Sequence, residues 1–350
     1  MKLTDATIRT FKPVKYFKEN SDRINSLSYS SNGETLISSS DDDQMVIYDC
    51  TSGTPKRTLN SKKYGVNLIQ FTHSPTTAVH ASTKIDGMNS IQTTHSFHAC
   101  HIQIPSDIFL YMTTNIFVTS KAIPKSEQPF VIYRFNHSRV VSLCMSPIDD
   151  TFLSGAMDCT IRLWDLRSPN CHGVMHVSGR PCAAFDPEGL IFAAGINSES
   201  VKLYDLRSFD KGPFATFKLG PETGGCVWTG LQFSADGKTL LIATNSNHIR
   251  LVDAFKGTHL HTLTLVSNAD HQALDASFTP DSQFVLVGSP DGLVHIWSVE
   301  TGVRIATLPG YEAATQLPNP AIHTLAFNPR YAMLATGSNQ TAFWLPNIEE

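Results

Sequence analysis

The sequence is poor in cysteine, has no long apolar run and carries no large excess of either charge. Its seven cysteines are scattered over 350 residues without a Cys-x-x-Cys pair, which argues against a disulfide framework and favours a reducing, intracellular compartment. The nearest candidate for a membrane span, residues 108–118, is far shorter than the roughly 18 apolar residues required. The first residues lack the apolar core of a secretory signal. We therefore expect a soluble chain with no membrane partner.

The charge balance limits the partners. Lys and Arg total 27 against 31 for Asp and Glu, a formal net charge of −4. A protein that holds nucleic acid through its phosphates usually carries a basic excess. The sequence therefore predicts no direct nucleic-acid partner.

Signatures of catalysis are also missing. There is no Gly-x-Ser-x-Gly and no His-Glu-x-x-His. Gly237-Lys238-Thr239 resembles the end of a phosphate-binding loop, but Gln232 stands where the loop needs its first glycine. A hairpin turn is the favoured interpretation. We predict no catalytic residue, no cofactor and no small-molecule substrate.

Two groups of residues leave a metal site open as an alternative. The first is the acidic run Asp41-Asp42-Asp43, and the second contains His95, His98, Cys100 and His101. Imidazole and thiolate are zinc ligands, but the spacing of the second group matches no zinc module. Solvated turn and loop residues are the favoured interpretation of both, so no metal is predicted.

An internal repeat organises the rest of the chain. Each copy has an apolar strand, a polar turn, a strand of small residues, a second turn, and a strand that usually ends in an aromatic residue and Asp. The alternation of apolar residues with a period of two indicates strands, and turns such as Asn32-Gly33 suit hairpins. The copies span residues 28–49, 143–165, 183–205, 231–253, 276–298 and 325–345.

The spacing of the copies predicts the fold class. The residues that end the third strands are Tyr48, Trp164, Tyr204, Val252, Trp297 and Trp344, and the last four steps are 40, 48, 45 and 47 residues. This period is typical of WD repeats. The step from Tyr48 to Trp164, 116 residues, hides a degenerate repeat and about 26 additional residues. We predict an all-β, seven-bladed WD-repeat β-propeller formed as one domain by residues 1–350.

Closure of the ring requires a strand from elsewhere in the chain. Each blade needs four strands, and the last copy reaches its third near Leu345, close to the last residue. The alternating stretch from Ile8 to Phe17 has no other partner. It is predicted to complete the last blade and so remove an open edge.

One blade carries a complete polar set that resembles the buried tetrad of WD repeats: His137, Ser154, Asp158 and Trp164. Trp only donates, the hydroxyl donates and accepts, His bridges and Asp accepts, so the four can satisfy one another. Other blades depart from this pattern. Asn20 and Asn268 are poor substitutes for His, and Val252 replaces the aromatic residue.

Longer stretches resemble a narrower family. They include TIRLWDLRSPNC (Thr160–Cys171), FDPEGLIFAAG (Phe185–Gly195) and VKLYDLRSFDKGPFATFK (Val201–Lys218). The chain resembles the WD-repeat subunits of COMPASS-type histone methyltransferase complexes, from Met1 to about Asp86 and from about Val131 onward. The resemblance implies a nuclear, chromatin-associated, non-enzymatic adaptor. Its implied partners are a histone lysine methyltransferase, other subunits, and RNA polymerase with a phosphorylated C-terminal tail. Relatives also occur in transcription-termination, RNA 3′-end-processing and phosphatase-targeting complexes.

The resemblance stops within blade two. Residues 87–129 contain no Trp-Asp ending and no turn at the expected offset. They are predicted to form an irregular insertion, in which the apolar stretch 108–118 is an alternative source of an outer strand.

A second function remains open. Trp164-Asp165-Leu166-Arg167 and Tyr204-Asp205-Leu206-Arg207 resemble the Trp-Asp-x-Arg box by which substrate receptors of cullin-RING ubiquitin ligases dock on their adaptor. The candidate docking residues are Asp165, Arg167, Asp205 and Arg207. The alternative is that they only form hydrogen bonds at a strand end.

Overall fold

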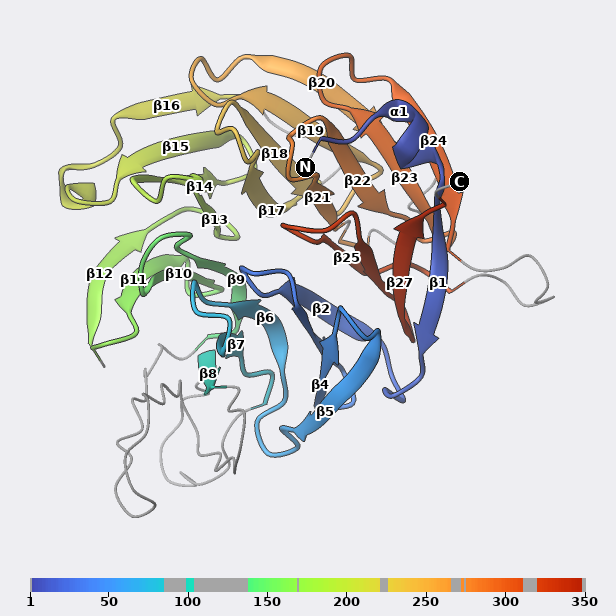
Figure 1. The fold of residues 1–350 in the computed structure, drawn as a ribbon. Helices are drawn as coiled ribbons and strands as arrows, with labels where there is room; N and C mark the ends of the chain where they lie inside the picture. The colour runs from blue at the N-terminus through green and yellow to red at the C-terminus, as the bar shows by residue number, and fades with distance from the viewer. Residues whose placement is uncertain are drawn as a thin grey trace.

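The fold is a ring of antiparallel sheets around a common axis (Figure 1). The computed structural model describes residues 2–84, 99–103, 138–168, 170–220, 226–265, 272–273, 275–310 and 320–347. These residues form six four-stranded sheets and one three-stranded sheet. The helices are short: α1 (Asp5–Arg9) and the 3₁₀ turn η1 (Phe209–Lys211). No described helix is long and apolar enough to cross a bilayer.

Five of the four-stranded sheets are built from strands that follow one another along the chain. The first two contain β2 (Ile24–Tyr29), β3 (Thr35–Ser40), β4 (Gln44–Asp49), β5 (Thr54–Asn60), and β9 (Val140–Met145), β10 (Thr151–Ala156), β11 (Thr160–Asp165), β12 (Cys171–His176). The next two contain β13 (Cys182–Phe185), β14 (Ile191–Ile196), β15 (Ser200–Asp205), β16 (Ala215–Lys218), and β17 (Trp228–Phe233), β18 (Thr239–Thr244), β19 (His248–Asp253), β20 (His259–Thr264). The fifth contains β21 (Ala276–Phe278), β22 (Phe284–Gly288), β23 (Leu293–Ser298) and β24 (Arg304–Pro309).

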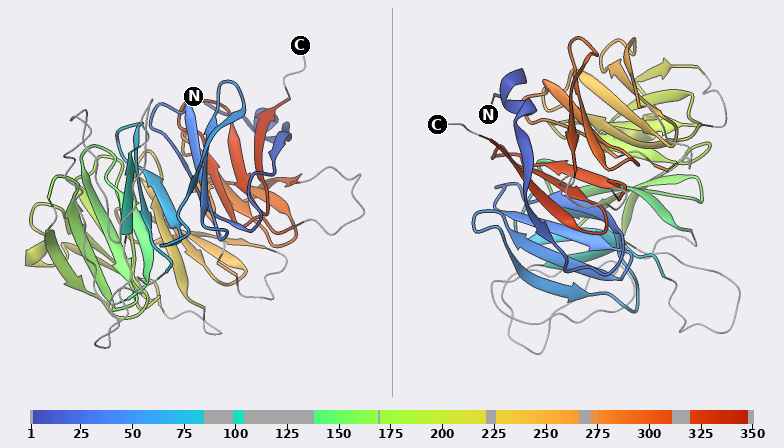
Figure 2. Two further views of the ribbon diagram at one scale, coloured as in Figure 1. Left: turned by 90° about the horizontal axis from the view of Figure 1, so that it is seen from below. Right: turned by 90° about the vertical axis from the view of Figure 1, so that its right-hand side faces the viewer.

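The sixth four-stranded sheet joins the two ends of the chain. It contains β25 (Thr324–Phe327), β26 (Leu334–Gly337), β27 (Thr341–Pro346) and the N-terminal strand β1 (Phe11–Phe17). β1 pairs antiparallel with β27, from Phe11 opposite Pro346 to Phe17 opposite Thr341, and the two lie side by side in Figure 2. The prediction that an N-terminal strand completes the last blade is confirmed.

The predicted start of that strand was wrong. Ile8 lies in α1 and not in a strand, because the Thr4 side chain accepts from the Thr7 N–H and caps a helical turn. The turn places Ile8 and Leu3 in a buried cluster with residues of β22–β24 and β25–β27, including Phe284 and Leu308. The N-terminal segment therefore contacts two neighbouring sheets.

The three-stranded sheet contains β6 (Asn67–Phe71), β7 (Thr77–Ala81) and β8 (Ala99–Gln103). β8 pairs antiparallel with β7, with Ala99 opposite Ala81. It lies inside the segment predicted to be an irregular insertion, so that prediction was wrong for residues 99–103. A strand edge needs partners for its N–H and C=O groups, and such backbone pairing does not require a Trp-Asp ending. Residues 87–98 and 104–129 lie outside the described residues.

The apolar core of the described residues is divided into seven clusters, one between each pair of neighbouring sheets. At the closure, Phe17 packs against Tyr48 and Phe343, with ring centroids 4.7 and 4.9 Å away. The three-stranded sheet shares one cluster with β2–β5 and another with β9–β12. Each sheet therefore buries both faces against its neighbours, as a propeller blade does.

Removing residues 1–19 should destroy the closure. β27 would lose its partner, and the aromatic cluster would lose Phe17. We expect insoluble or oligomeric protein, because an unpaired strand edge recruits other chains. Size-exclusion chromatography and thermal melting check this result. Val14→Ala is the control, because the Val14 side chain on β1 is 49% exposed. A truncated chain that stays monomeric and melts like the full chain would contradict the closure.

A buried histidine leads to a prediction about how the free energy of unfolding depends on pH. His80 on β7 is 2% exposed, its Nδ1 lies 3.2 Å from the Ala81 carbonyl oxygen, and burial lowers its pKa from 6.5 to about 4. Between these values the unfolded chain binds a proton that the folded chain does not. The free energy of unfolding should therefore fall as the pH falls, by about 1.4 kcal/mol per pH unit for this group.

Urea denaturation of the wild type and His80→Gln between pH 7 and pH 4 tests the assignment. The variant should show a slope against pH that is shallower by about that amount. Identical slopes would show that His80 takes up its proton equally in both states.

Candidate functional site

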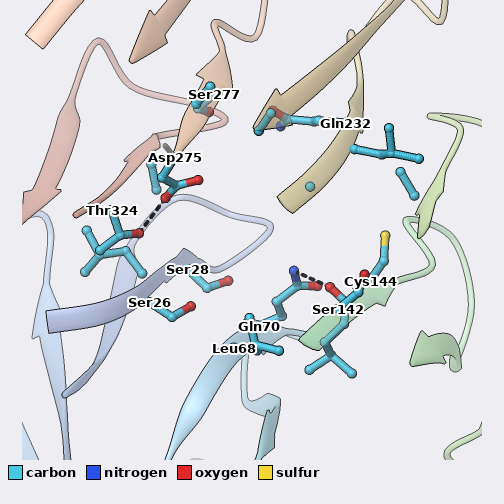
Figure 3. A pocket seen from close by; sticks show the side chains of 18 of the residues that line it. Ser26, Ser28, Leu68, Gln70, Ser142, Cys144, Gln232, Asp275, Ser277 and Thr324 are labelled. Carbon is cyan, nitrogen blue, oxygen red and sulfur yellow. Dashed lines mark hydrogen bonds between the residues drawn. The ribbon is translucent and has the colours of Figure 1, made fainter. Parts of the chain in front are cut away.

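The innermost strands surround a central channel. These are β2, β6, β9, β13, β17, β21 and β25, and they line a cavity of about 820 Å³. Most of the side chains labelled in Figure 3 are polar. The labelled side chains occupy two positions that lie two residues apart along the chain. The first position holds Ser26, Leu68, Ser142, Asp275 and Thr324, and the second holds Ser28, Gln70, Cys144, Gln232 and Ser277.

Several wall side chains bind the backbone of the next inner strand. Gln70 donates from Nε2 to the Leu143 carbonyl over 2.9 Å and accepts from the Met145 N–H over 3.1 Å. Ser28 Oγ accepts from the Phe71 N–H, and Asp275 Oδ2 accepts from the Leu325 N–H over 3.0 Å. Inner strands do not pair with each other as sheets do, so these bonds satisfy backbone groups that would otherwise face the channel.

β17 departs from this arrangement. Gln232 holds the position of Gln70, since each directly precedes the phenylalanine that ends its inner strand. Yet Gln232 Oε1 and Thr229 Oγ1 are buried without a hydrogen-bond partner among the described residues. This part of the wall therefore differs from the part around Gln70, whose amide is fully engaged.

Three arginines line one end of the channel: Arg23, Arg139 and Arg180. Each lies one or two residues before an inner strand, and the inner strands run in the same direction, so these side chains meet at one rim. Arg23 Nε lies 3.7 Å from Asp41 Oδ2. Arg139 and Arg180 make no ion pair within the described residues. Burial and the charge of Arg139 lower the pKa of Arg180.

Sequence reasoning missed these arginines. The repeat pattern identifies strands and turns, and the arginines precede the first strand of their copies. A comparison of the residues that precede the first strand of each copy would have found these arginines.

The predicted tetrad is described in part. Trp164 Nε1 donates to Ser154 Oγ over 2.9 Å, and Trp344 Nε1 donates in the same way to Thr336 Oγ1. Asp158 Oδ1 accepts from the Thr160 hydroxyl at 2.6 Å and the Thr160 N–H at 3.1 Å. Its Oδ2 lies 3.9 Å from Arg162 Nη2 and is buried without a hydrogen bond to the described residues. His137 lies outside the described residues, so the four-residue chain stays a prediction.

In the first blade, Asn20 was expected to substitute poorly for histidine. Its Nδ2 lies 3.3 Å from both carboxylate oxygens of Asp42, while its Oδ1 is buried without a hydrogen-bond partner among the described residues. An amide N–H can donate to Asp as an imidazole does. Asn20 therefore contacts the Asp that its blade provides.

The two candidate metal groups have different outcomes. The acidic run is dispersed: Asp41 accepts from Asn25 over 2.7 Å, Asp42 faces Asn20, and Asp43 pairs with Lys84. Within the described residues no group of three or more His, Cys, Asp or Glu side chains could hold a metal. Of the second group, Cys100 and His101 belong to β8, whereas His95 and His98 lie outside the described residues.

The two Asp-Leu-Arg turns differ from each other. After β11, Arg167 Nε and Nη2 donate to the two oxygens of Asp165 over 2.9 and 2.6 Å, and this bond lowers the pKa of Asp165. After β15, the Arg207 backbone N–H donates to Asp205 over 2.8 Å, but the exposed Arg207 guanidinium makes no ion pair within the described residues. The first arginine is bound to its own turn, and the second is available to a partner.

Asp158→Ala should destabilise the protein by about 1–3 kcal/mol, because the buried Thr160 N–H loses its acceptor. The control is Asp210→Ala, since Asp210 is exposed in η1. Denaturant midpoints measure the difference. Equal midpoints for the two variants would show that the Asp158 turn contributes nothing measurable.

The ring of sheets, the Trp–hydroxyl bonds and the polar channel define a WD-repeat β-propeller. The WD domain, G-beta repeat family matches residues 11–49, 130–165 and 258–298. The anaphase-promoting complex subunit 4 WD40 domain family matches residues 215–271.

Full-length relatives identify a narrower family. The chain is 52% identical to WD repeat-containing protein 82 of Drosophila melanogaster, over 100% of this chain and 99% of the relative. It is 31% identical to the Set1 complex component swd2 of Schizosaccharomyces pombe, over 98% of each chain. It is 30% identical to the COMPASS component SWD2 of Saccharomyces cerevisiae, over 96% and 95%. The chain belongs to this family of WD-repeat proteins.

Proposed function

We propose that the chain is a non-enzymatic scaffold subunit of a nuclear, COMPASS-type histone methyltransferase complex, and that it links this complex to transcribing RNA polymerase. The observation that carries the proposal is similarity along the whole chain to proteins named as Set1 complex and COMPASS components. The direct partners would be the catalytic methyltransferase subunit, other complex subunits and the phosphorylated polymerase tail. The same adaptor role extends to termination, 3′-end-processing and phosphatase-targeting complexes.

The architecture suits a scaffold. We count the three-stranded sheet β6–β8 as a seventh blade, because it shares an apolar cluster with the sheet on each side. The ring then forms one domain whose blades support each other. Loops on such a rigid frame hold their side chains in place for partners.

The ligase alternative has one observation in its favour and one against it. The exposed Arg207 is free to dock on an adaptor, but Arg167 already donates to both oxygens of Asp165. Releasing Arg167 would leave a carboxylate that is only 10% exposed without its charged partner. We therefore place this function second.

The experiment is affinity purification of the tagged full chain from nuclear extract, with the wild type and the Arg167→Ala, Arg207→Ala double variant. Both should recover the histone methyltransferase catalytic subunit in yields that agree within about twofold, because neither guanidinium is assigned to that interface. Arg167→Ala also removes the charged partner of Asp165, so the fold of the variant is checked separately. Quantitative mass spectrometry measures the recovery.

Circular dichroism of the double variant is the control for folding. Loss of the methyltransferase in a folded double variant would assign these arginines to that interface. Recovery of a cullin-RING adaptor instead of a methyltransferase with the wild type would replace the proposal by the alternative.

A further inference from the structure

We propose that the outer edge formed by β1 and β5 binds the phosphate backbone of double-helical DNA without reading its sequence. The inference goes beyond the proposed function, because it assigns a nucleic-acid surface to the chain itself, on the outermost strands of two neighbouring sheets.

Cations are concentrated at this edge. Residues 11–18 and 54–63 contain seven Lys and Arg and no Asp or Glu, and all seven cationic residues are exposed. The outer strands β12, β16, β20 and β24 carry only Lys218 and Arg304 between them. The net charge of −4 for the whole chain therefore hides a local positive surface. We call this surface the basic edge, and its members are Lys12, Lys15, Lys18, Lys56, Arg57, Lys62 and Lys63.

Closure of the ring brings the two segments together. β1 is the outer strand of the last blade, and β5 is the outer strand of the first (Figure 1). Gly53, in the turn that leads into β5, lies against β1, because a Cβ at Gly53 would be 3.8 Å from Lys15 Cδ. Phe17 of β1 also shares an apolar cluster with Tyr48 of β4. Cations that are far apart in the sequence thus form one surface.

Most of these charges are not neutralised by the described residues. Lys56 Nζ lies 3.0 Å from Asp49 Oδ2. Like charges that gather on one surface repel each other, and a polyanion that binds there reverses this term and releases its own condensed counterions. Five members of the basic edge make no ion pair within the described residues, namely Lys12, Lys15, Lys18, Arg57 and Lys62.

The positions of the cations suit an extended polyanion. Lys12, Lys15 and Lys18 recur every three residues and span about 20 Å of the edge. B-DNA carries one negative charge per about 1.7 Å of its axis, so an edge of this length faces several phosphates at once. The cations of β5 and of the turn after it provide a second row.

The side-chain types favour a double helix over other polyanions. Lysines bind phosphate as mobile point charges, and the exposed side chains of Thr58 and Asn60 can also donate to phosphate. Proteins that bind single strands add aromatic side chains on which bases stack, whereas Phe17 is buried and Tyr16 is half-buried. A protein partner needs apolar anchors, and on these two fully described strands Val14 is the one large apolar side chain that is exposed.

The test is fluorescence anisotropy of the full chain with a labelled DNA duplex of arbitrary sequence, over a series of salt concentrations. The edge variant combines Lys12→Gln, Lys15→Gln, Lys18→Gln and Arg57→Gln. The matched control removes the same charge from exposed positions in the sheets β13–β16 and β17–β20. It combines Lys211→Gln, Lys218→Gln, Lys238→Gln and Lys256→Gln.

The wild type should bind the duplex, and its affinity should fall as the salt concentration rises, because bound phosphates release counterions. At about 0.1 M salt the edge variant should bind at least about tenfold more weakly, with a salt slope lower by about three. The control variant should stay within about twofold of the wild type. Thermal melting checks that both variants are folded.

A second variant leaves the closing strand unchanged. Arg57→Gln with Lys62→Gln should weaken duplex binding by about threefold or more, so the test holds even where substitutions in β1 disturb the ring.

Three results would overturn the inference: no binding of the duplex by the wild type at low salt, equal losses in the edge and control variants, or tighter edge-dependent binding of poly-glutamate or of phosphatidylserine–phosphatidylcholine vesicles than of the duplex. The measurement uses the purified chain alone. It can therefore fail while recovery of the methyltransferase stands, and it can succeed where that recovery fails.

Discussion

The pairing of β1 with β27 is the interaction on which the rest of the structure depends. A propeller blade buries both faces against its neighbours, so an incomplete last blade would expose apolar surface and a strand edge together. The chain solves this by placing its first strand beside its last, from Phe11 opposite Pro346 to Phe17 opposite Thr341. Phe17 then fills the contact with Tyr48 of the first blade. The ends of the chain hold the ring shut.

A closed ring makes the inner wall a fixed surface. Gln70, Ser28 and Asp275 each bind the backbone of the next inner strand, and these bonds use up polar groups that line the channel. The exceptions are local: Thr229 Oγ1 and Gln232 Oε1 have no hydrogen-bond partner among the described residues, and the rim arginines Arg139 and Arg180 make no ion pair there.

Residue patterns predicted much of the fold. Trp164, Trp297 and Trp344 marked third strands because the blade repeats one hydrogen-bonded unit at a regular spacing. β8 escaped detection, since residues 99–103 pair through their backbone and carry no Trp-Asp ending. The helical turn at Ile8 was missed because its apolar residues also fit an alternating strand, and the Thr4 cap decided the outcome.

The site was harder to predict than the fold. Asp165-Leu166-Arg167 and Asp205-Leu206-Arg207 are the same three residue types, yet only the first closes an ion pair. The two turns diverge just after the arginine, because the residues that follow Arg207 enter η1. The residue types of the motif alone therefore do not determine the side-chain geometry. Arg139 and Arg180 are brought together by neighbouring blades, a contact that no local pattern in the sequence reports.

Hydrogen–deuterium exchange at β27 tests the central claim that the β1–β27 pairing holds the ring closed. If it does, the amides of residues 341–345 should exchange only on global unfolding, as slowly as those of the inner strand β18, because opening β27 opens the ring. Exchange of β27 at the faster rate of the outer strands β5 and β12, while β18 stays protected, would show that the terminal pairing opens on its own and does not hold the ring.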